Sequence, residues 1–415
     1  AVKEAVEKAI AARVGAITVL TAGFKEIGGA GVELEAELVA IAEKHGMRII
    51  GPNCMGIVNT DEAVRLDGQF GPTFPPHGNV AMASQSGALG LAILKQATQL
   101  KIGLSSFVSL GNQADVSNND LMLYWEDDPM TDVIVMYTES FGNPRRFGRI
   151  ARRVGRDKPI VVVKSGRSRS GARAASSHTG SMASLDVAVD ALFEQSGTIR
   201  TDTMVELFNV TALLANQPLP RGPRVAVMTN AGGPAILAAD ALESNGLELP
   251  EFSEELQAAL REHLPAEAAV QNPVDMIAAA QPANYAQTIE TILSFNEVDA
   301  LMVIQIPTGP DTSEDVATAV HAAVEAGGVG RGDARHLDRR LGRGGVLDHV
   351  AAVVDRPAGG RGVRRCDRHL ALRQLHRERL SAEHPDQLRL PRQPGRVPDH
   401  REPALPECAG ARCAD

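Results

Sequence analysis

The sequence predicts an α/β protein whose domains are built mainly on parallel sheets. Short apolar runs alternate with amphipathic helical segments through residues 1–330, which is typical of parallel strands joined by crossover helices. Two Pro- and Gly-rich stretches, 69–78 and 217–223, interrupt this alternation and indicate linkers. The alternation is lost after about residue 328. We therefore expect three folded blocks and an unpatterned tail, at 1–68, 79–216, 224–328 and 329–415.

Each block is expected to hold strands of apolar, β-branched sequence. The opening strand and Gly-rich turn of the first block are missing, so this block is predicted to be the C-terminal part of a Rossmann-type domain. The middle block, with about five strands, is long enough to form an independent sheet. The expected strands are Ala16–Leu20, Arg48–Ile50, Val80–Ala83, Ser106–Leu110, Val133–Tyr137, Ile160–Val163, Arg224–Thr229 and Ala300–Ile304.

Composition and charge exclude several classes of protein. Hydrophobic residues make up 44% of the chain, enough for ordinary packed cores, and no run of about 20 apolar residues predicts a membrane span. The net charge of −9 argues against a dedicated nucleic-acid-binding protein. The opening residues show no secretory pattern, so we expect no signal peptide there. Because the four cysteines lack paired metal spacing, we expect a reducing cytoplasm, no disulfide framework and no metal site.

The final stretch differs in kind from the rest of the chain. All its basic residues are arginine, and it lacks Lys, Phe, Tyr, Trp, Ile, Met, Asn and Thr. The joint loss of residues with AT-rich codons favours a reading-frame error in GC-rich DNA. The alternative is a disordered basic tail that binds nucleic acid or an acidic surface. We assign no function after residue 328 and expect a chain truncated at both ends. The tail should add no strand to the third block, leaving apolar surface exposed along Ala300–Ile306.

The first candidate site is the turn after the expected strand Val80–Ala83. It consists of Ser84, Gln85, Ser86 and Gly87 and leads directly into a helix. Unpaired N–H groups and the positive end of the helix dipole at such a turn bind anions, most simply a phosphoryl group. The alternative is an ordinary helix cap, because serine before a helix is also what capping requires.

The second candidate is His178, the one histidine of a Gly-, Ser- and Ala-rich segment at 164–180. The segment leaves the expected strand Ile160–Val163 at its C-terminal end, where open α/β sheets bind their ligands. A neutral imidazole can attack phosphorus and hold the phosphoryl group as a labile intermediate. A surface-loop histidine without a catalytic role is the alternative.

Glu139 follows the expected strand Val133–Tyr137 and is predicted to share a sheet edge with the first two candidates. Its carboxylate would accept the second ring N–H of His178, which fixes the tautomer and steadies the charge of a phosphohistidine. Helix capping or solvent contact is the alternative. Gly111 and Asn112 follow another strand and are expected at the pocket rim. The turn holding Ser84 should therefore lie against Glu139.

Two strand-to-turn crossings in the first block suit a nucleotide-like ligand. Residues 20–22 follow the first strand, and Asn53 follows the second within a Gly-Pro-Asn-Cys-Met-Gly sequence. Cys54 has no histidine or other base beside it, so we interpret it as a small buried residue. Neither crossing specifies one ligand.

Taken together and in this order, these segments resemble the ADP-forming acyl-CoA synthetases, a superfamily that includes succinyl-CoA synthetase. The resemblance spans residues 1–325 without a break. It implies a CoA-binding domain followed by two flavodoxin-like ligase domains. The motifs that carry it are Gly51-Pro52-Asn53-Cys54-Met55-Gly56, Ser84-Gln85-Ser86-Gly87, Ser109-Leu110-Gly111-Asn112-Gln113-Ala114-Asp115, Glu139-Ser140, Ser176-Ser177-His178-Thr179-Gly180, Thr229-Asn230-Ala231-Gly232-Gly233-Pro234 and Asn272-Pro273-Val274-Asp275.

The resemblance also implies roles for individual residues. His178 matches the family's phosphohistidine, and Glu139 matches the carboxylate that orients it. The candidate phosphoryl-binding residues are Ser84, Gln85, Ser86, Gly87, Gly111 and Asn112. The candidate CoA-binding residues are Leu20, Thr21, Ala22 and Asn53.

The implied reaction interconverts acyl-CoA, ADP and phosphate with a carboxylic acid, CoA and ATP. Phosphate displaces CoA to give an acyl phosphate, His178 takes the phosphoryl group, and the phosphohistidine passes it to ADP on an ATP-grasp module. That module, with its expected Mg²⁺, is not readable in this chain, so a separate subunit or fused domain within an oligomer is expected to supply it. The chain alone should not turn over.

Two other interpretations compete with this one. The main alternative is the synthetase-like, ligand-binding regulatory region of a protein lysine acetyltransferase, for which loss of the phosphohistidine is the expected mark. The presence of both His178 and Glu139 favours the enzyme. A NAD-binding dehydrogenase is excluded because no G-x-G-x-x-G with a downstream acid occurs in the visible sequence. The acyl group and the direction in the cell stay open.

Overall fold

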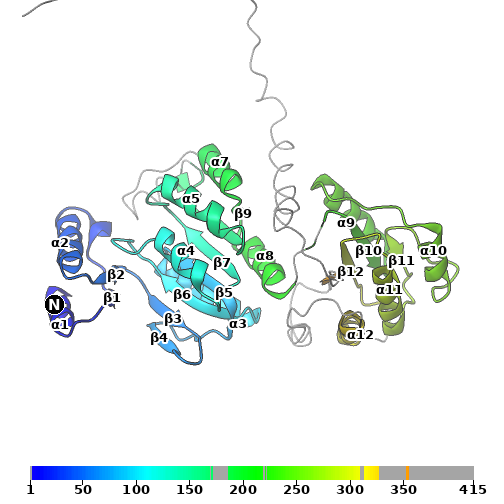
Figure 1. Ribbon diagram of the computed structural model, residues 1–415, viewed down its shortest axis with the longest axis horizontal. Helices are drawn as coiled ribbons and strands as arrows, with labels where there is room; N and C mark the ends of the chain where they lie inside the picture. Colours follow the sequence, from blue (N-terminus) through cyan, green and yellow to red (C-terminus); the bar gives the residue numbers. More distant parts are fainter. Residues whose placement is uncertain are drawn as a thin grey trace, which may run out of the picture.

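In the part of the chain that it describes, the computed structural model contains three sheets, of two, seven and four strands (Figure 1). Parallel pairing dominates, with helices joining the strands, as the sequence predicts. The residues described are 2–168, 170–171, 186–217, 220, 222–308, 313–326 and 352–354. His178 lies outside these ranges, whereas the start of the segment that carries it and residue 186, where the description resumes, lie within them.

The first unit is a small two-stranded parallel sheet with two helices. Val6 of the first helix and Leu38 and Ala42 of the second pack with Ile49 of the sheet in one apolar cluster. This unit therefore has a small core of its own. Its elements are α1 (Val2–Ala11), β1 (Ala16–Thr18), η1 (Lys25–Ile27), α2 (Ala30–Lys44) and β2 (Arg48–Ile50).

The second unit holds the seven-stranded sheet, in the order β4-β3-β6-β5-β7-β8-β9. Its five strands from β5 onward are parallel, and their order is that of a flavodoxin-like sheet, 2-1-3-4-5. Ligands of such sheets bind at the carboxyl ends of the strands. The strands are β3 (Gly56–Asn59), β4 (Leu66–Gln69), β5 (His77–Ser84), β6 (Leu104–Ser109), β7 (Val133–Thr138), β8 (Ile160–Lys164) and β9 (Ile199–Thr201).

Helices cover both faces of this sheet. On one face, Trp125, Phe147 and Phe193 belong to one core cluster, contributed by α4, α5 and α7. On the other, Ile93 of α3 and Leu207 of α8 belong to a second cluster. Burial on both faces explains why the central strands read as continuous apolar runs. The helices are α3 (Gly87–Gln99), α4 (Asn118–Asp127), α5 (Pro144–Val154), α7 (Asp186–Ser196) and α8 (Met204–Asn216).

The hairpin of β3 and β4 differs from the sequence expectation. Its residues fall in the predicted first block, but β3 pairs antiparallel with β6 of the seven-stranded sheet, with Val58 opposite Phe107. The Pro- and Gly-rich stretch 69–78 is therefore a connection within the second unit. A strand as short and exposed as β4 has no apolar run by which sequence reasoning could recognise it.

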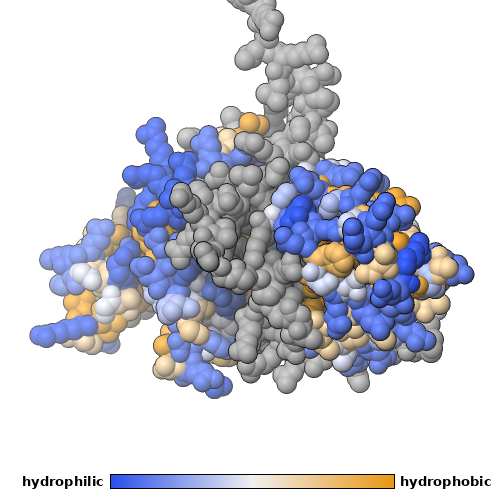
Figure 2. All heavy atoms as spheres, turned by 45° about the vertical axis from the view of Figure 1, so that its right-hand side comes forward, coloured by the Kyte–Doolittle hydropathy of each residue, from blue (hydrophilic) through white to orange (hydrophobic). Residues whose placement is uncertain are grey.

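The third unit has the strand order β11-β10-β12-β13. The cluster around Leu256, Tyr285 and Val320 lies on one side of the sheet, and a smaller cluster with Leu242 lies on the side of α9. Much of the surface in the space-filling view is hydrophilic (Figure 2). The elements are β10 (Val225–Thr229), α9 (Gly232–Ser244), α10 (Glu254–Arg261), β11 (Val274–Asp275), α11 (Pro282–Ser294), β12 (Ala300–Ile304), α12 (Ser313–Ala326) and β13 (Ala352–Val354).

Two expectations about the tail were wrong. Residues 352–354 form β13, which pairs antiparallel with β12, so the tail does add a strand to the third sheet. The strand β12 is also not exposed: Leu301 and Val303 are fully buried. The physical reason is that β12 lies between β10 and β13 and packs against helices on the face of the larger cluster.

Across the described ranges, no helix is both long enough and apolar enough to cross a membrane.

Candidate functional site

The turn between β5 and α3 is both a helix cap and an open helix start. Ser84 is fully buried, and its hydroxyl donates to the Ser86 carbonyl at 2.8 Å. The Ser86 hydroxyl accepts from the Leu89 amide at 3.3 Å, so Ser86 is the N-cap. The amides of Gly87 and Ala88 precede Leu89 on the first turn, where a helix offers its N–H groups no internal partner. The turn therefore keeps the capacity to bind an anion.

Gln85 joins two turns at the sheet edge. Its buried side-chain amide donates to the Ser140 carbonyl at 2.6 Å and accepts from the Ser140 amide at 2.8 Å and from the Glu139 amide. The expected adjacency of this turn and Glu139 is thus confirmed. The Gln85 side-chain amide binds the backbone that carries Glu139, and the predicted phosphoryl contact of Gln85 within this turn stays a prediction.

Charge gathers at the carboxyl ends of β7 and β8. Lys164 ends β8 almost completely buried, and its ammonium donates to the Ser165 carbonyl. Burial lowers the pKa of Lys164, while the carboxylates of Asp186 and Glu139 act to raise it. Sequence reasoning assigned Lys164 no role. A single lysine at the end of an otherwise apolar strand, directly before a Gly- and Ser-rich segment, was the available signal.

The segment that carries His178 starts next to Glu139. The Ser165 amide, the first after β8, donates to the Thr138 carbonyl at 3.0 Å, and Thr138 directly precedes Glu139. His178 itself lies outside the described residues, so its contact with Glu139 stays a prediction. What the geometry brings together is the open helix start of α3, the Glu139 turn and the origin of the histidine segment.

Asn112 joins the first and second units, and its place at the rim of the phosphoryl site stays a prediction. Its side-chain amide donates to Glu26 at 2.6 Å and to Glu35 at 2.8 Å, both of the first unit, and its oxygen accepts from Asn53 at 3.3 Å. Burial acts to raise the pKa of Glu26, but the hydrogen bond from Asn112 and those from backbone amides lower it below its usual value. We therefore regard Asn112 as a junction residue.

Gly111 explains how closely the two units approach. Its φ of 53° lies in the left-handed region, and a Cβ there would lie 2.1 Å from the Pro52 carbonyl oxygen. The chain that follows runs along the first unit, with the Asn112 amide donating to the Pro52 carbonyl at 2.9 Å. The side chain of Asp115 accepts from the Ile49 amide at 2.8 Å. Only glycine fits this crossing without displacing backbone.

The candidate CoA-binding residues form an exposed turn beside that junction. Leu20 is 40% exposed, and Thr21 and Ala22 are exposed as well. The Asn53 amide donates to the Thr21 carbonyl at 3.0 Å, which joins the two strand-to-turn crossings. Cys54 is buried as expected, and burial raises the pKa of its thiol to about 11, which makes it a poor nucleophile.

The third unit repeats the strand–turn–helix arrangement at the start of α9. The Thr229 hydroxyl accepts from the Ala231 amide at 3.1 Å, and the Asn230 side chain donates to the Ile306 carbonyl at 2.7 Å. The helix then opens at Gly232, where an added Cβ would lie 3.0 Å from a carboxylate oxygen of Asp275. This helix start therefore has the carboxylate of Asp275 beside it. Among the described residues, no group of three or more His, Cys, Asp or Glu side chains is placed to hold a metal ion.

The domains themselves match those of CoA ligases. Residues 77–214 match the succinyl-CoA ligase-like flavodoxin domain, and residues 225–334 match the ligase-CoA domain. The second match extends past residue 328, the position after which the sequence alone led us to assign no function. The class that the fold and these matches define is therefore that of proteins with succinyl-CoA ligase-like domains.

Individual relatives narrow the class further. The chain is 46% identical over 293 residues to the alpha subunit of ADP-forming acetate–CoA ligase II of Pyrococcus furiosus, covering 70% of this chain and 63% of that protein. It is 38% identical over 356 residues to ADP-forming acetate–CoA ligase I of Archaeoglobus fulgidus, covering 85% of this chain and 51% of that protein. The chain thus spans about half to three fifths of the length of these relatives.

A solved structure agrees with these sequence relatives. The acetyl-coenzyme A synthetase 1 of Ca. Korarchaeum cryptofilum, in complex with phosphate and ADP, matches with a TM-score of 0.77 and 33% identity, covering 92% of this chain and 81% of that one. The chain belongs to the family of ADP-forming acyl-CoA synthetases.

Proposed function

We propose that this chain is the acyl-CoA- and phosphoryl-handling part of an ADP-forming acyl-CoA synthetase, with His178 as the residue that carries the phosphoryl group. The observation that supports this most directly is the bonding of Gln85 to the turn of Glu139. It sets the turn that carries Glu139 against the turn that precedes α3, at the carboxyl end of the sheet. The segment of His178 leaves the neighbouring strand next to the same turn.

The proposed reaction has three balanced steps. Phosphate oxygen attacks the thioester carbonyl, and the thiolate of CoA leaves, giving an acyl phosphate. A ring nitrogen of His178 attacks phosphorus, the bond from phosphorus to the acyl oxygen breaks, and the carboxylic acid is released. The phosphohistidine then transfers its phosphoryl group to ADP, which forms ATP and restores the neutral imidazole. Glu139 would hold the ring N–H opposite the attacking nitrogen, and the amides at the start of α3 would stabilise the phosphoryl oxygens.

The substrate is proposed to be a small carboxylic acid and its CoA thioester. Relatives of this chain include ligases named for acetate and for 4-hydroxybutyrate, which supports an acid of this kind without singling out one. CoA is proposed to contact the exposed turn of Leu20, Thr21 and Ala22 beside Asn53.

The nucleotide is proposed to bind elsewhere. Because the relative from Pyrococcus furiosus is named as an alpha subunit, we propose that an ATP-grasp subunit or fused domain binds ATP or ADP with Mg²⁺, and that the assembly is a cytoplasmic oligomer. No step within this chain is assigned to the metal. The relatives reported above are named as CoA ligases, so nothing favours the acetyltransferase-associated alternative.

The test is acid-labile phosphate on His178. The complete enzyme, this chain with its ATP-grasp subunit or domain, is incubated with radiolabelled ATP or with acetyl-CoA and labelled phosphate. Phosphopeptides are then mapped under alkaline conditions. Label is expected on the peptide of His178, lost in His178→Ala and retained in His45→Ala, a control at an exposed histidine of the first unit. Equal labelling of the His178→Ala protein would contradict the proposal.

A further inference from the structure

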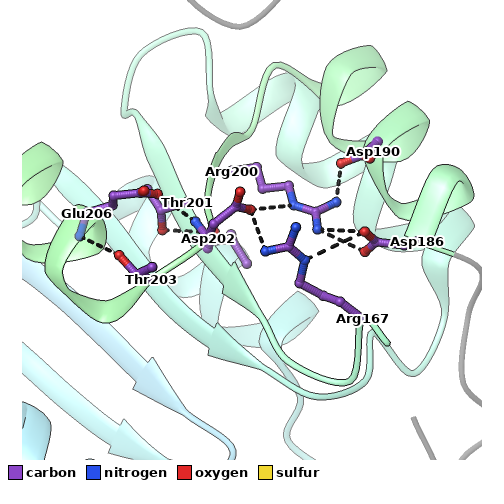
Figure 3. A network of polar contacts seen from close by, with 9 residues as sticks. Arg167, Asp186, Asp190, Arg200, Thr201, Asp202, Thr203 and Glu206 are labelled. Carbon is purple, nitrogen blue, oxygen red and sulfur yellow. Dashed lines mark hydrogen bonds and ion pairs between the residues drawn. The ribbon is translucent and has the colours of Figure 1, made fainter. Parts of the chain in front are cut away.

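A cluster of five charged side chains lies where the histidine segment leaves and rejoins the second unit (Figure 3). Two arginines and three aspartates take part, drawn from the chain just after β8, from α7 and from β9 with the turn that follows it. Figure 3 shows the two guanidinium groups lying between the carboxylates. The members are Arg167, Asp186, Asp190, Arg200 and Asp202.

Arg200 is the centre of the cluster. Its side chain is only 5% exposed, and it pairs with Asp186 at 2.8 Å, with Asp202 at 3.4 Å and with Asp190. A buried guanidinium with three carboxylates around it is well compensated, whereas removal of one partner from such a set leaves an uncompensated buried charge. Arg200 is therefore a fixed point of the second unit.

Arg167 connects this fixed point to both ends of the histidine segment. It lies after β8, pairs with Asp202 at 2.8 Å and approaches Asp186 to 3.6 Å. Asp186 is the first residue of α7, on the far side of the segment. One guanidinium thus holds the outgoing end of the segment to the residue at which the chain returns.

Asp202, which pairs with both arginines, is itself held in place at the start of α8. The Asp202 amide donates to the Glu206 carboxylate at 2.8 Å, and the Thr203 hydroxyl accepts from the Glu206 amide at 3.1 Å. These contacts cap α8 and hold Asp202 in place (Figure 3). The cluster therefore joins a stretch of chain to a rigid part of the fold and does more than pair surface charges.

From this geometry we propose that the Arg167–Asp186–Arg200–Asp202 cluster is the anchor of the phosphohistidine segment and that Arg167 is a positioning residue for phosphoryl transfer. The proposal rests on the function proposed above. Holding the two ends of a segment together restricts where its middle can lie. His178 is proposed to contact a carboxylate and a phosphoryl group within hydrogen-bond distance. That restriction should favour its reaction, because a misplacement of about 1 Å costs up to ~100-fold in rate.

The experiment compares three variants in the complete enzyme. Arg167→Ala removes the bridge, Arg167→Lys keeps the charge but loses the forked geometry, and Arg153→Ala is the matched control. Arg153 makes a two-pronged ion pair with Glu126 at 2.7 and 2.6 Å on the same domain, in the last turn of α5 and outside the cluster. Rapid-quench measurement gives the rate of His178 phosphorylation from ATP, and the affinity for CoA is measured separately.

We expect Arg167→Ala to slow phosphorylation roughly 10- to 100-fold with unchanged CoA affinity, Arg167→Lys to lie between it and wild type, and Arg153→Ala to match wild type. Hydrogen–deuterium exchange over residues 168–185 should rise in Arg167→Ala alone. Equal rates and equal exchange for Arg167→Ala and Arg153→Ala would overturn the anchor. Wild-type enzyme that never carries phosphate on His178 would instead overturn the proposed function, while the exchange measurement would still decide whether the anchor exists.

Discussion

Replacing Gln85 with alanine should weaken both the second unit and phosphoryl transfer. The Gln85 amide is buried and holds three backbone groups of the next turn, the two amides of Glu139 and Ser140 and the Ser140 carbonyl. Alanine would leave these groups without their partner and would free the turn that presents the Glu139 carboxylate. The variant therefore tests whether adjacency at this sheet edge is functional.

The size of the effect follows from the number of bonds. Each intramolecular hydrogen bond contributes about 1 kcal/mol net, so the loss of three predicts a destabilisation of roughly 3 kcal/mol. For a domain of this size that corresponds to a fall in melting temperature of roughly 6–12 °C. Gln85→Glu is a sharper variant, because its second carboxylate oxygen would face the Ser140 carbonyl, to which the amide now donates at 2.6 Å.

Tryptophan fluorescence offers a local assay. Trp125 is the chain's single tryptophan and is fully buried in the second unit, with its indole N–H donating to Ser106. Urea unfolding followed at Trp125 should show the loss for Gln85→Ala but not for Gln96→Ala, a control at an exposed glutamine of α3. The rate of His178 phosphorylation should fall in parallel. If the two variants unfold alike and transfer phosphate alike, the reasoning about this turn is refuted.

Three further outcomes are expected. Gly111→Ala, with φ at 53° and an added Cβ against a backbone oxygen, should lower CoA affinity more than ATP affinity by calorimetry. Asn112→Asp sets a third carboxylate beside Glu26 and Glu35 and removes the hydrogen-bond donor that lowers the pKa of Glu26. The variant should therefore be less stable than wild type in urea, with the largest difference at neutral pH. The difference should shrink as pH falls below 4.5, the usual pKa of a glutamate. Iodoacetamide at pH 8 should label Cys54 only as the protein unfolds, and the stability from this thiol, present below its usual pKa of 9.0, should be lost as pH rises through about 11.

The parallel α/β class and most strands follow from the sequence alone. Strands such as Val133–Thr138 and Ile160–Lys164 are buried on both faces, so they appear as unbroken apolar runs that need no tertiary information to recognise. The sequence also predicts that candidate sites placed directly after these runs lie together, because the strands of one parallel sheet end at a common edge. That the turn of Ser84 meets the turn of Glu139 could therefore be predicted.

Short and polar elements could not be predicted in the same way. The hairpin of β3 and β4 and the three-residue strand β9 depend on neighbouring strands for their pairing. The strand β13 lies in a stretch whose composition suggested no strand at all, yet it pairs with β12. A short strand pairs where the rest of the fold leaves a sheet edge free, and the local sequence pattern does not contain that information.

Which side chains meet was also decided only by the tertiary structure. In sequence, Gln85 and Asn112 are polar residues in turns and fit a phosphoryl site equally well; in the fold, the first binds the Glu139 turn and the second binds Glu26 and Glu35. Arg167 follows β8 and Arg200 lies in β9, and no local sequence pattern predicts that they join one ion-pair cluster. The physical reason is that hydrogen bonds and ion pairs form between groups far apart along the chain, so their partners exist only once the backbone has brought them together.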